Sequence, residues 1–240
     1  RAGMQYRDLI PSRLGGSIIA SHIRIPNGGA VPDMVHFHSV GFQLIYCYKG
    51  WVDLVYEDQG PPFRLHAGNC VIQPPEIRHR VLFASDNIEV IEIGVPAEHI
   101  TTIDHDMDLP TAELKPEREF SGQKFVHCQA HDAEWQPYRL PGFLGRDTSI
   151  SHNTQAVADV QLVKLGDGAP VWVTHNSDIH FTFVLEGSLI LEGADQLAQH
   201  LVAGDAFVIP PGMKFCYQSP SQDISLLEVS LPGDFEIETV

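Results

Sequence analysis

Short apolar runs alternate with polar breaks along nearly the whole chain. Runs rich in Val, Ile, Phe, Tyr and Leu recur between clusters of Gly, Pro, Asn and Asp, and helical periodicity is hard to find. This pattern predicts an all-β protein built from many short strands. The expected strands are residues 42–48, 51–56, 70–73, 90–95, 158–165, 181–185, 188–191 and 206–209.

The second half of the chain repeats the first in three segments. The segments keep their order and a nearly constant separation, whereas chance matches would scatter in separation. A duplicated domain is therefore predicted. The aligned pairs are residues 41–50 with 178–187, residues 68–75 with 204–211, and residues 7–8 with 146–147.

A charged stretch with several prolines separates the two halves. Charges and breakers gather at residues 104–110 and 115–119, which is typical of a connecting segment. We expect an N-terminal domain at 1–105, a structured linker at 106–141 and a C-terminal domain at 142–240. Within the linker, residues 123–128 are expected to form a strand.

A pair of histidines marks the main candidate site. His36 and His38 would point to the same face of a strand, because side chains alternate along it. Gln43 opens the next apolar run, and His79 follows a Gly-led turn and a Pro-Pro step. About one H-x-H is expected by chance among 13 histidines, so the ordered spacing, rather than the pair, predicts a metal site.

The spacing resembles the two motifs of the cupin superfamily, G-x5-H-x-H-x(3,4)-E-x6-G and G-x5-P-x-G-x2-H-x3-N. The resemblance covers residues 4–95 and 143–231, and implies a bicupin: all-β, with two tandem jelly-roll (double-stranded β-helix) barrels. It also implies one divalent metal ion in the N-terminal barrel. The ligands would be His36, His38, Gln43 and His79.

The sequence departs from both motifs. Gln43 stands where the family usually has Glu, Glu76 replaces the inner Gly of the second motif, Ala84 or a neighbour replaces its Asn, and the leading Gly is out of register. A neutral amide leaves the metal charge uncompensated, so we expect stronger Lewis acidity and easier binding of an anionic substrate such as an enolate or carboxylate. The resemblance favours Fe(II), and Mn, Ni, Zn or Cu also suit such ligands.

The second half keeps only part of this ligand set. Val173 and Phe215 occupy the positions of His36 and His79, and a divalent first-row metal usually needs at least three protein ligands. The C-terminal barrel is therefore expected to be a degenerate structural or dimerising copy. In the alternative, His175 and His180 form a vestigial second metal site or act as general bases in an empty cavity.

Charge and composition limit the classes of partner that the protein can bind. A net charge of −16 with scattered basic residues argues against nucleic acid and anionic membranes. No apolar run approaches a membrane span and no signal peptide is visible, so a cytoplasmic location is expected. The four widely separated cysteines suggest buried thiols, with Cys47 facing the barrel interior.

Three functions fit these features. The first is a metal-dependent dioxygenase acting on a small aromatic, enolic or diketone compound, as quercetin and gentisate dioxygenases, which are similar bicupins, do. The second is a non-oxidative lyase or isomerase, because cupins with Gln in the acid position include hydroxynitrile lyases and the isomerase of bacilysin synthesis. The third is a non-catalytic binding module. We expect a small-molecule substrate and a homodimer formed through strand edges; Tyr46 and Glu92 are equal candidates for an acid or base.

Overall fold

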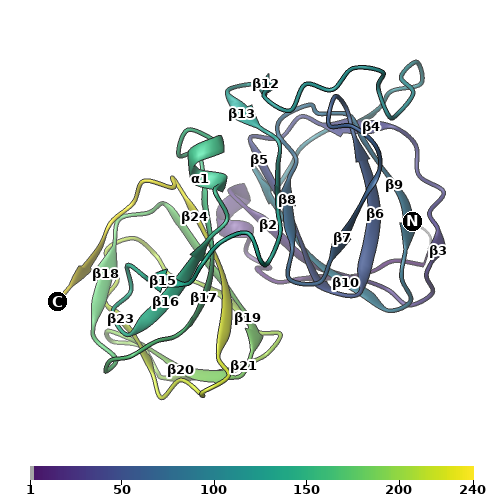
Figure 1. Cartoon of the computed structure of the whole chain (residues 1–240). Helices are drawn as coiled ribbons and strands as arrows, with labels where there is room; N and C mark the ends of the chain where they lie inside the picture. Colours follow the sequence, from purple (N-terminus) through teal and green to yellow (C-terminus); the bar gives the residue numbers. More distant parts are fainter. Residues whose placement is uncertain (1–2) are drawn as a thin grey trace. The chain divides into compact units, whose positions relative to one another are not determined.

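The structure, a computed structural model, describes residues 3–240 and consists of two compact units, Arg1–Ala130 and His131–Val240. The division falls inside the stretch 106–141 that was expected to link the domains, and residues 106–130 belong to the first unit. Each unit is an all-β jelly-roll barrel (Figure 1). In the described part of the chain, no helix has the length and apolar character needed to cross a membrane.

Two antiparallel sheets form the barrel of the first unit. The elements are β1 (Gln5–Asp8), the 3-10 turn η1 (Arg13–Gly16), β2 (Ile19–Ile25), β3 (Gly29–Ala30), β4 (His36–His38), β5 (Phe42–Lys49), β6 (Trp51–Tyr56), β7 (Phe63–His66), β8 (Cys70–Ile72), β9 (His79–Ala84), β10 (Ile88–Val95), β11 (Thr101–Ile103), β12 (Glu119–Phe120), β13 (Gln123–Lys124) and β14 (Val126–Cys128). One sheet has the order β1-β2-β10-β5-β8-β14, and the other has β11-β4-β9-β6-β7 with β3 beside β9. β14 comes from the expected linker and extends the first sheet of this barrel.

The second unit has the same design. Its elements are β15 (Gln136–Pro137), β16 (Phe143–Asp147), α1 (Ile150–Asn153), β17 (Asp159–Leu165), β18 (Val173–His175), β19 (Ile179–Glu186), β20 (Ser188–Gly193), β21 (Gln199–Val202), β22 (Ala206–Val208), β23 (Phe215–Gln218), β24 (Ser225–Leu231) and β25 (Ile237–Thr239). The sheets run β15-β16-β17-β24-β19-β22 and β21-β20-β23-β18-β25. The strand order β17-β24-β19-β22 of the second unit therefore corresponds to the order β2-β10-β5-β8 of the first. The sequence repeat is accompanied by a repeat of the sheet topology.

The two central hairpins show why the repeat keeps its glycines. Gly50 and Gly187 stand between β5 and β6 and between β19 and β20, with φ of 76° and 75°, a region that L side chains rarely adopt. In each hairpin the next backbone N–H donates to a serine hydroxyl, that of Ser85 at 3.0 Å and that of Ser221 at 2.9 Å. A side chain at either glycine would also clash with that serine.

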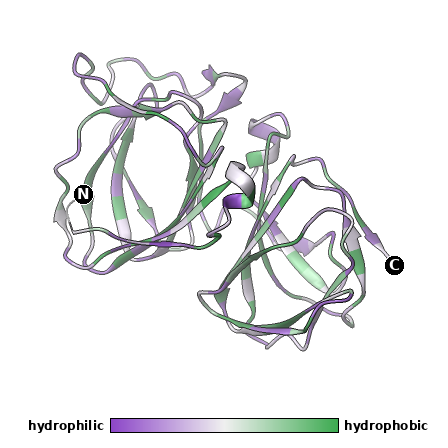
Figure 2. Cartoon of the chain, turned by 180° about the vertical axis from the view of Figure 1, so that it is seen from behind, coloured by the Kyte–Doolittle hydropathy of each residue, from purple (hydrophilic) through white to green (hydrophobic). Residues whose placement is uncertain are grey.

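Strand alternation separates an inner from an outer face in both barrels, and hydrophobic and hydrophilic residues alternate along the strands in Figure 2. In the first unit Cys47, Leu54 and Tyr56 belong to one buried cluster, as expected for Cys47. In the second unit Val173, Phe215 and neighbouring apolar residues form the buried cluster. The four cysteines are buried thiols.

Candidate metal centre

Two neighbouring strands of one sheet, β4 and β9, bring three histidines of the first unit together. His36 of β4 lies directly opposite His79 of β9, and His79 lies opposite Tyr56 of β6. The ring centroids of His36 and His79 are 4.3 Å apart, and each lies 5.2 Å from the His38 ring. One ligand atom from each histidine falls within 4.8 Å of the others, so the geometry suits a single ion.

The local backbone explains how these side chains face inward. In β4 the two histidines point to one side, and Phe37 between them packs under the guanidinium of Arg78, 4.2 Å from its ring. Before β9, the chain turns through Glu76, whose φ of 64° is the conformation for which the motif usually supplies glycine. The Glu76 amide donates to the His38 carbonyl at 3.0 Å, which ties the turn to β4.

Hydrogen bonds at Nδ1 fix the orientation of the rings. Nδ1 of His36 lies 2.8 Å from the Met34 carbonyl, and Nδ1 of His79 lies 3.0 Å from the Ile77 carbonyl. A carbonyl only accepts, so each Nδ1 carries the proton and Nε2 of the neutral ring keeps its lone pair. Burial lowers the pKa of His79 well below its usual range, and the neighbouring His36 adds to the shift, which favours the neutral form that binds metals.

Gln43 approaches from the other sheet. Its Nε2 donates to Oε1 of Glu92 at 2.7 Å, while its own Oε1 is buried without a hydrogen-bond partner among the described residues. An unpartnered buried carbonyl oxygen is costly in a native protein unless a ligand satisfies it. Imidazole nitrogens and amide oxygens are donors that suit a divalent first-row metal ion.

Glu92 is the buried carboxyl beside this donor set. It lies on β10, opposite Ile45 of β5, and burial raises its pKa despite the hydrogen bond from Gln43. By accepting from Nε2, Glu92 decides which end of the Gln43 amide is left for a metal. An outer-shell contact of this kind typically changes metal affinity 10–100-fold.

Replacing Glu92 by leucine is therefore expected to weaken metal binding by about 10-fold or more. Glu92→Gln keeps an acceptor for the Gln43 amide and should bind metal nearly as tightly as the parent. Titration of both variants with Co(II), followed by calorimetry, measures the difference. An equal loss in both variants would show that the charge of Glu92, and not its hydrogen bond, supports the metal.

A cavity of about 460 Å³ opens beside the histidines, within the range of small-molecule sites. His36, His38 and His79 line it together with Glu92 and Thr101. The remaining wall is chiefly apolar. The cavity and the histidines therefore form one site inside the first barrel.

Comparisons with known proteins agree with this architecture. A family model described as a cupin domain matches residues 160–230, which lie in the second unit. No curated protein matches the chain by sequence.

Solved structures match both units at once. Salicylate 1,2-dioxygenase from Pseudaminobacter salicylatoxidans has a TM-score of 0.69 and 15% identity over 93% of this chain and 75% of its own. A variant of Bacillus subtilis oxalate decarboxylase has 0.69 and 14%, over 99% and 74%. Protein Ylba from E. coli has 0.69 and 13%, over 95% and 83%. The chain has the bicupin fold.

The second barrel of this bicupin closes the equivalent site with apolar side chains. Val173 lies directly opposite Phe215, which is the ladder position that His36 and His79 occupy in the first barrel. Both residues are buried, and the metal-ligand cluster found among the described residues lies in the first barrel.

The two histidines of the candidate second site, His175 and His180, have hydrogen-bond partners within the second barrel. His175 Nε2 lies 3.0 Å from the Ile209 carbonyl, and its Nδ1 accepts from the Ser177 amide at 3.2 Å. His180 Nδ1 lies 2.8 Å from the Ser230 hydroxyl. With both ring nitrogens of His175 occupied, we expect this bicupin to bind one metal ion per chain.

Two arginines near the motif residues, Arg64 and Arg78, form ion pairs with carboxylates of the first unit. Arg64 forms two hydrogen bonds with Asp53, at 2.8 and 2.9 Å, and Arg78 pairs with Asp104 at 3.1 Å. Both arginines thus have carboxylate partners. Of the two candidates for an acid or base, Glu92 lines the cavity, whereas Tyr46 does not.

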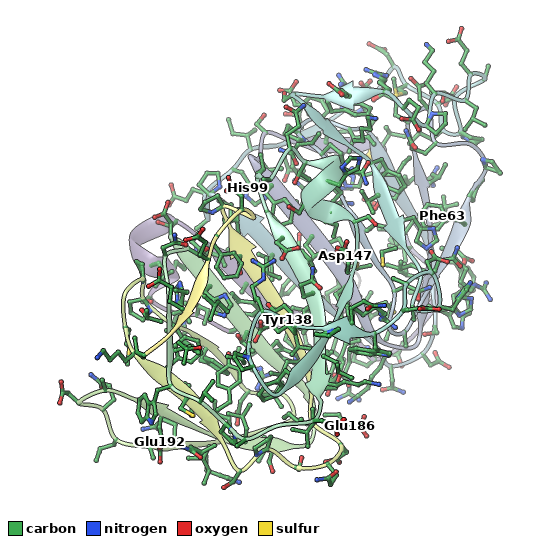
Figure 3. The ribbon with its side chains drawn as sticks, turned by 60° about the vertical axis from the view of Figure 1, so that its left-hand side comes forward. Phe63, His99, Tyr138, Asp147, Glu186 and Glu192 are labelled. Atoms are coloured by element: carbon green, nitrogen blue, oxygen red, sulfur yellow. The ribbon has the colours of Figure 1, made fainter. Side chains whose placement is uncertain are left out.

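Two residues next to the histidine cluster carry no motif signal. Thr101 of β11 lies opposite His38, and its hydroxyl is 2.9 Å from His38 Nδ1. His99, labelled in Figure 3, lies in the loop between β10 and β11, and its ring lies 5.4 Å from that of His38. Both follow β10 in the sequence and return to β4, a pairing that the apolar pattern of the chain does not reveal.

Proposed function

We propose that the first barrel is the active site of a metal-dependent enzyme, most simply a dioxygenase acting on a small aromatic, enolic or diketone compound. The observation that supports it best is the cluster of three histidines on the cavity wall, whose Nδ1 atoms are all hydrogen-bonded. Gln43, whose amide donates to Glu92 on the same wall, keeps its Oε1 buried without a partner among the described residues. The structural likeness to a salicylate dioxygenase is consistent with this reaction class.

This proposal assigns four side chains to the metal ion. His36, His38, His79 and Gln43 would hold the divalent ion, with iron(II) as the first choice; manganese also fits, since the similar oxalate decarboxylase is described with Mn(II) centres. The bound ion would supply a Lewis acid and open coordination positions for substrate and dioxygen.

The surrounding residues prepare the site. Glu92 holds the Gln43 amide, and the Tyr56 ring stacks on His79 at 5.5 Å between centroids, which restrains the imidazole. The apolar walls of the cavity exclude water and strengthen polar contacts with a bound molecule.

Oxygen consumption tests the reaction class. The chain is loaded with Fe(II) under anoxia and offered catechols, diketones and hydroxy acids, and then oxygen is admitted. We expect oxygen uptake that depends on one of these compounds and is lost in His36→Ala. The dioxygenase proposal fails if turnover continues at the same rate without oxygen.

A non-oxidative lyase or isomerase is the second candidate, and the buried carboxyl of Glu92 on the cavity wall favours it. A carboxyl group there could move a proton to or from a bound substrate. The likeness to an oxalate decarboxylase is consistent with this class. Turnover that persists under anoxia and falls in Glu92→Gln would select it.

A further inference from the structure

The wall of the cavity in the first barrel is built by inward-facing residues of both sheets. Ile23, Ile25, Ile45, Ile88 and Val90 come from one sheet. From the other sheet and its loops come Val31, Pro32, Val52, Leu54 and Val81. Away from the histidines, a bound molecule would therefore meet mostly aliphatic carbon.

The polar residues of the wall include no cation. No Lys or Arg lines the cavity among the described residues, and besides the histidines the polar lining residues are Tyr6, Asp33, Tyr56, Gln73, Glu92 and Thr101. Some of these polar groups already have partners: Gln73 Nε2 donates to the Tyr56 hydroxyl at 2.9 Å, and Asp33 accepts from the Val81 amide at 3.0 Å. The two groups of the wall that carry a charge at neutral pH in water, Asp33 and Glu92, are both carboxylic acids.

This composition disfavours a second negative charge on the substrate. A carboxylate held away from the metal would be buried among aliphatic side chains without a counter-ion, which is costly. It would also be close to the acids at Asp33 and Glu92. A group that coordinates the metal is different, because the ion itself compensates its charge.

We infer that the cavity takes a small molecule with an apolar body and one group of metal-binding oxygens, and with no further anionic group. This inference rests on the proposed function, since it assumes the metal. It narrows the expectation of an anionic substrate: an enolate fits, whereas a compound with a carboxylate remote from the metal does not. A dicarboxylate whose second carboxylate lies away from the metal is therefore disfavoured.

Two diketones that differ only in this charge test the inference. The probes are 1-phenylbutane-1,3-dione and its para-carboxylate, titrated into the Co(II)-loaded chain while the visible bands of cobalt report coordination. We expect the carboxylate to bind at least ten-fold more weakly. Equal or tighter binding of the carboxylate, or binding of neither compound to the cobalt-loaded chain, would overturn the inference.

A charge placed in the wall provides the matched variant. Val31 lies half-buried in a loop that lines the cavity. Val31→Lys should therefore reduce the ten-fold difference in affinity between the neutral and the carboxylated diketone. Val202→Lys adds the same charge at an exposed position of the second unit and should leave the difference in affinity between the two diketones unchanged. Equal effects of both variants would overturn the inference. Failure of the parent to bind Co(II) would instead overturn the proposed function itself.

Discussion

Replacing His79 by alanine is expected to abolish stoichiometric metal binding by the chain. His79 is buried between His36 and Tyr56, and it is one of only three histidines in the cluster. A site with two imidazoles and one amide lacks the three strong ligands that catalytic sites usually keep. We expect affinity for Co(II) to fall by more than about 100-fold, beyond the range of outer-shell changes. Calorimetry and elemental analysis measure it.

The buried position of His79 requires a second variant, because its removal also leaves a void beside Tyr56. His38 is less buried, so His38→Ala should lose the metal with little effect on folding. His66→Ala, which changes an exposed histidine on β7, is the matched control and should keep one metal ion per chain. The proposed site is wrong if His79→Ala and His38→Ala both fold and retain tightly bound metal.

The sequence predicted the fold because apolar alternation and the turn residues are local signals. The predicted strands at 51–56 and 188–191 correspond to β6 and to β20, and the all-β jelly-roll class is confirmed. Several other strands were missed. β11, for example, is exposed along its length and has no apolar pattern. The pairing with β4 that holds it in place joins residues far apart in the sequence.

Part of the candidate site could be predicted from the sequence, because some of its signals are also local. The H-x-H pair and the Pro-Pro turn are local, whereas Glu92 reaches Gln43 only through the register of β10 on β5. The repeat contained a usable signal: Glu228 holds the equivalent position in β24, opposite Thr182 of β19. A carboxyl group recurs inside both barrels, and only in the first does it lie beside a metal-ligand cluster among the described residues.

Glu228 and His180 are expected to give the second unit opposing dependences on pH. Burial raises the pKa of Glu228 to about 7, although Tyr138, labelled in Figure 3, donates to it at 2.7 Å. Burial lowers the pKa of His180 to about 3, and His175 adds to the shift. The folded state thus holds the Glu228 proton more tightly than the unfolded state and the His180 proton less tightly.

The sign of each contribution follows from linkage. Between the ordinary pKa of 4.5 and about 7, the Glu228 contribution to stability falls as pH rises, by up to about 3 kcal/mol. The His180 contribution is complete above 6.5 and is lost as pH falls toward 3. In the parent chain the two slopes oppose each other between about pH 4.5 and 6.5.

Glu228→Gln removes the contribution of Glu228 to the pH dependence of stability and leaves that of His180. We expect its free energy of unfolding, relative to the parent, to increase by up to about 3 kcal/mol between pH 4.5 and pH 8. Urea unfolding is followed in the full chain carrying Trp51→Phe, so that the remaining tryptophans, Trp135 and Trp172, both report on the second unit.

Glu186 is the matched control for Glu228. It is an exposed glutamate at the end of β19 in the same unit and is labelled in Figure 3, so Glu186→Gln should keep the pH profile of the parent. A profile of Glu228→Gln parallel to that of the parent would mean that Glu228 titrates alike in the folded and unfolded states. The buried and the exposed glutamate would then behave alike, and the second barrel would have to admit water to its interior.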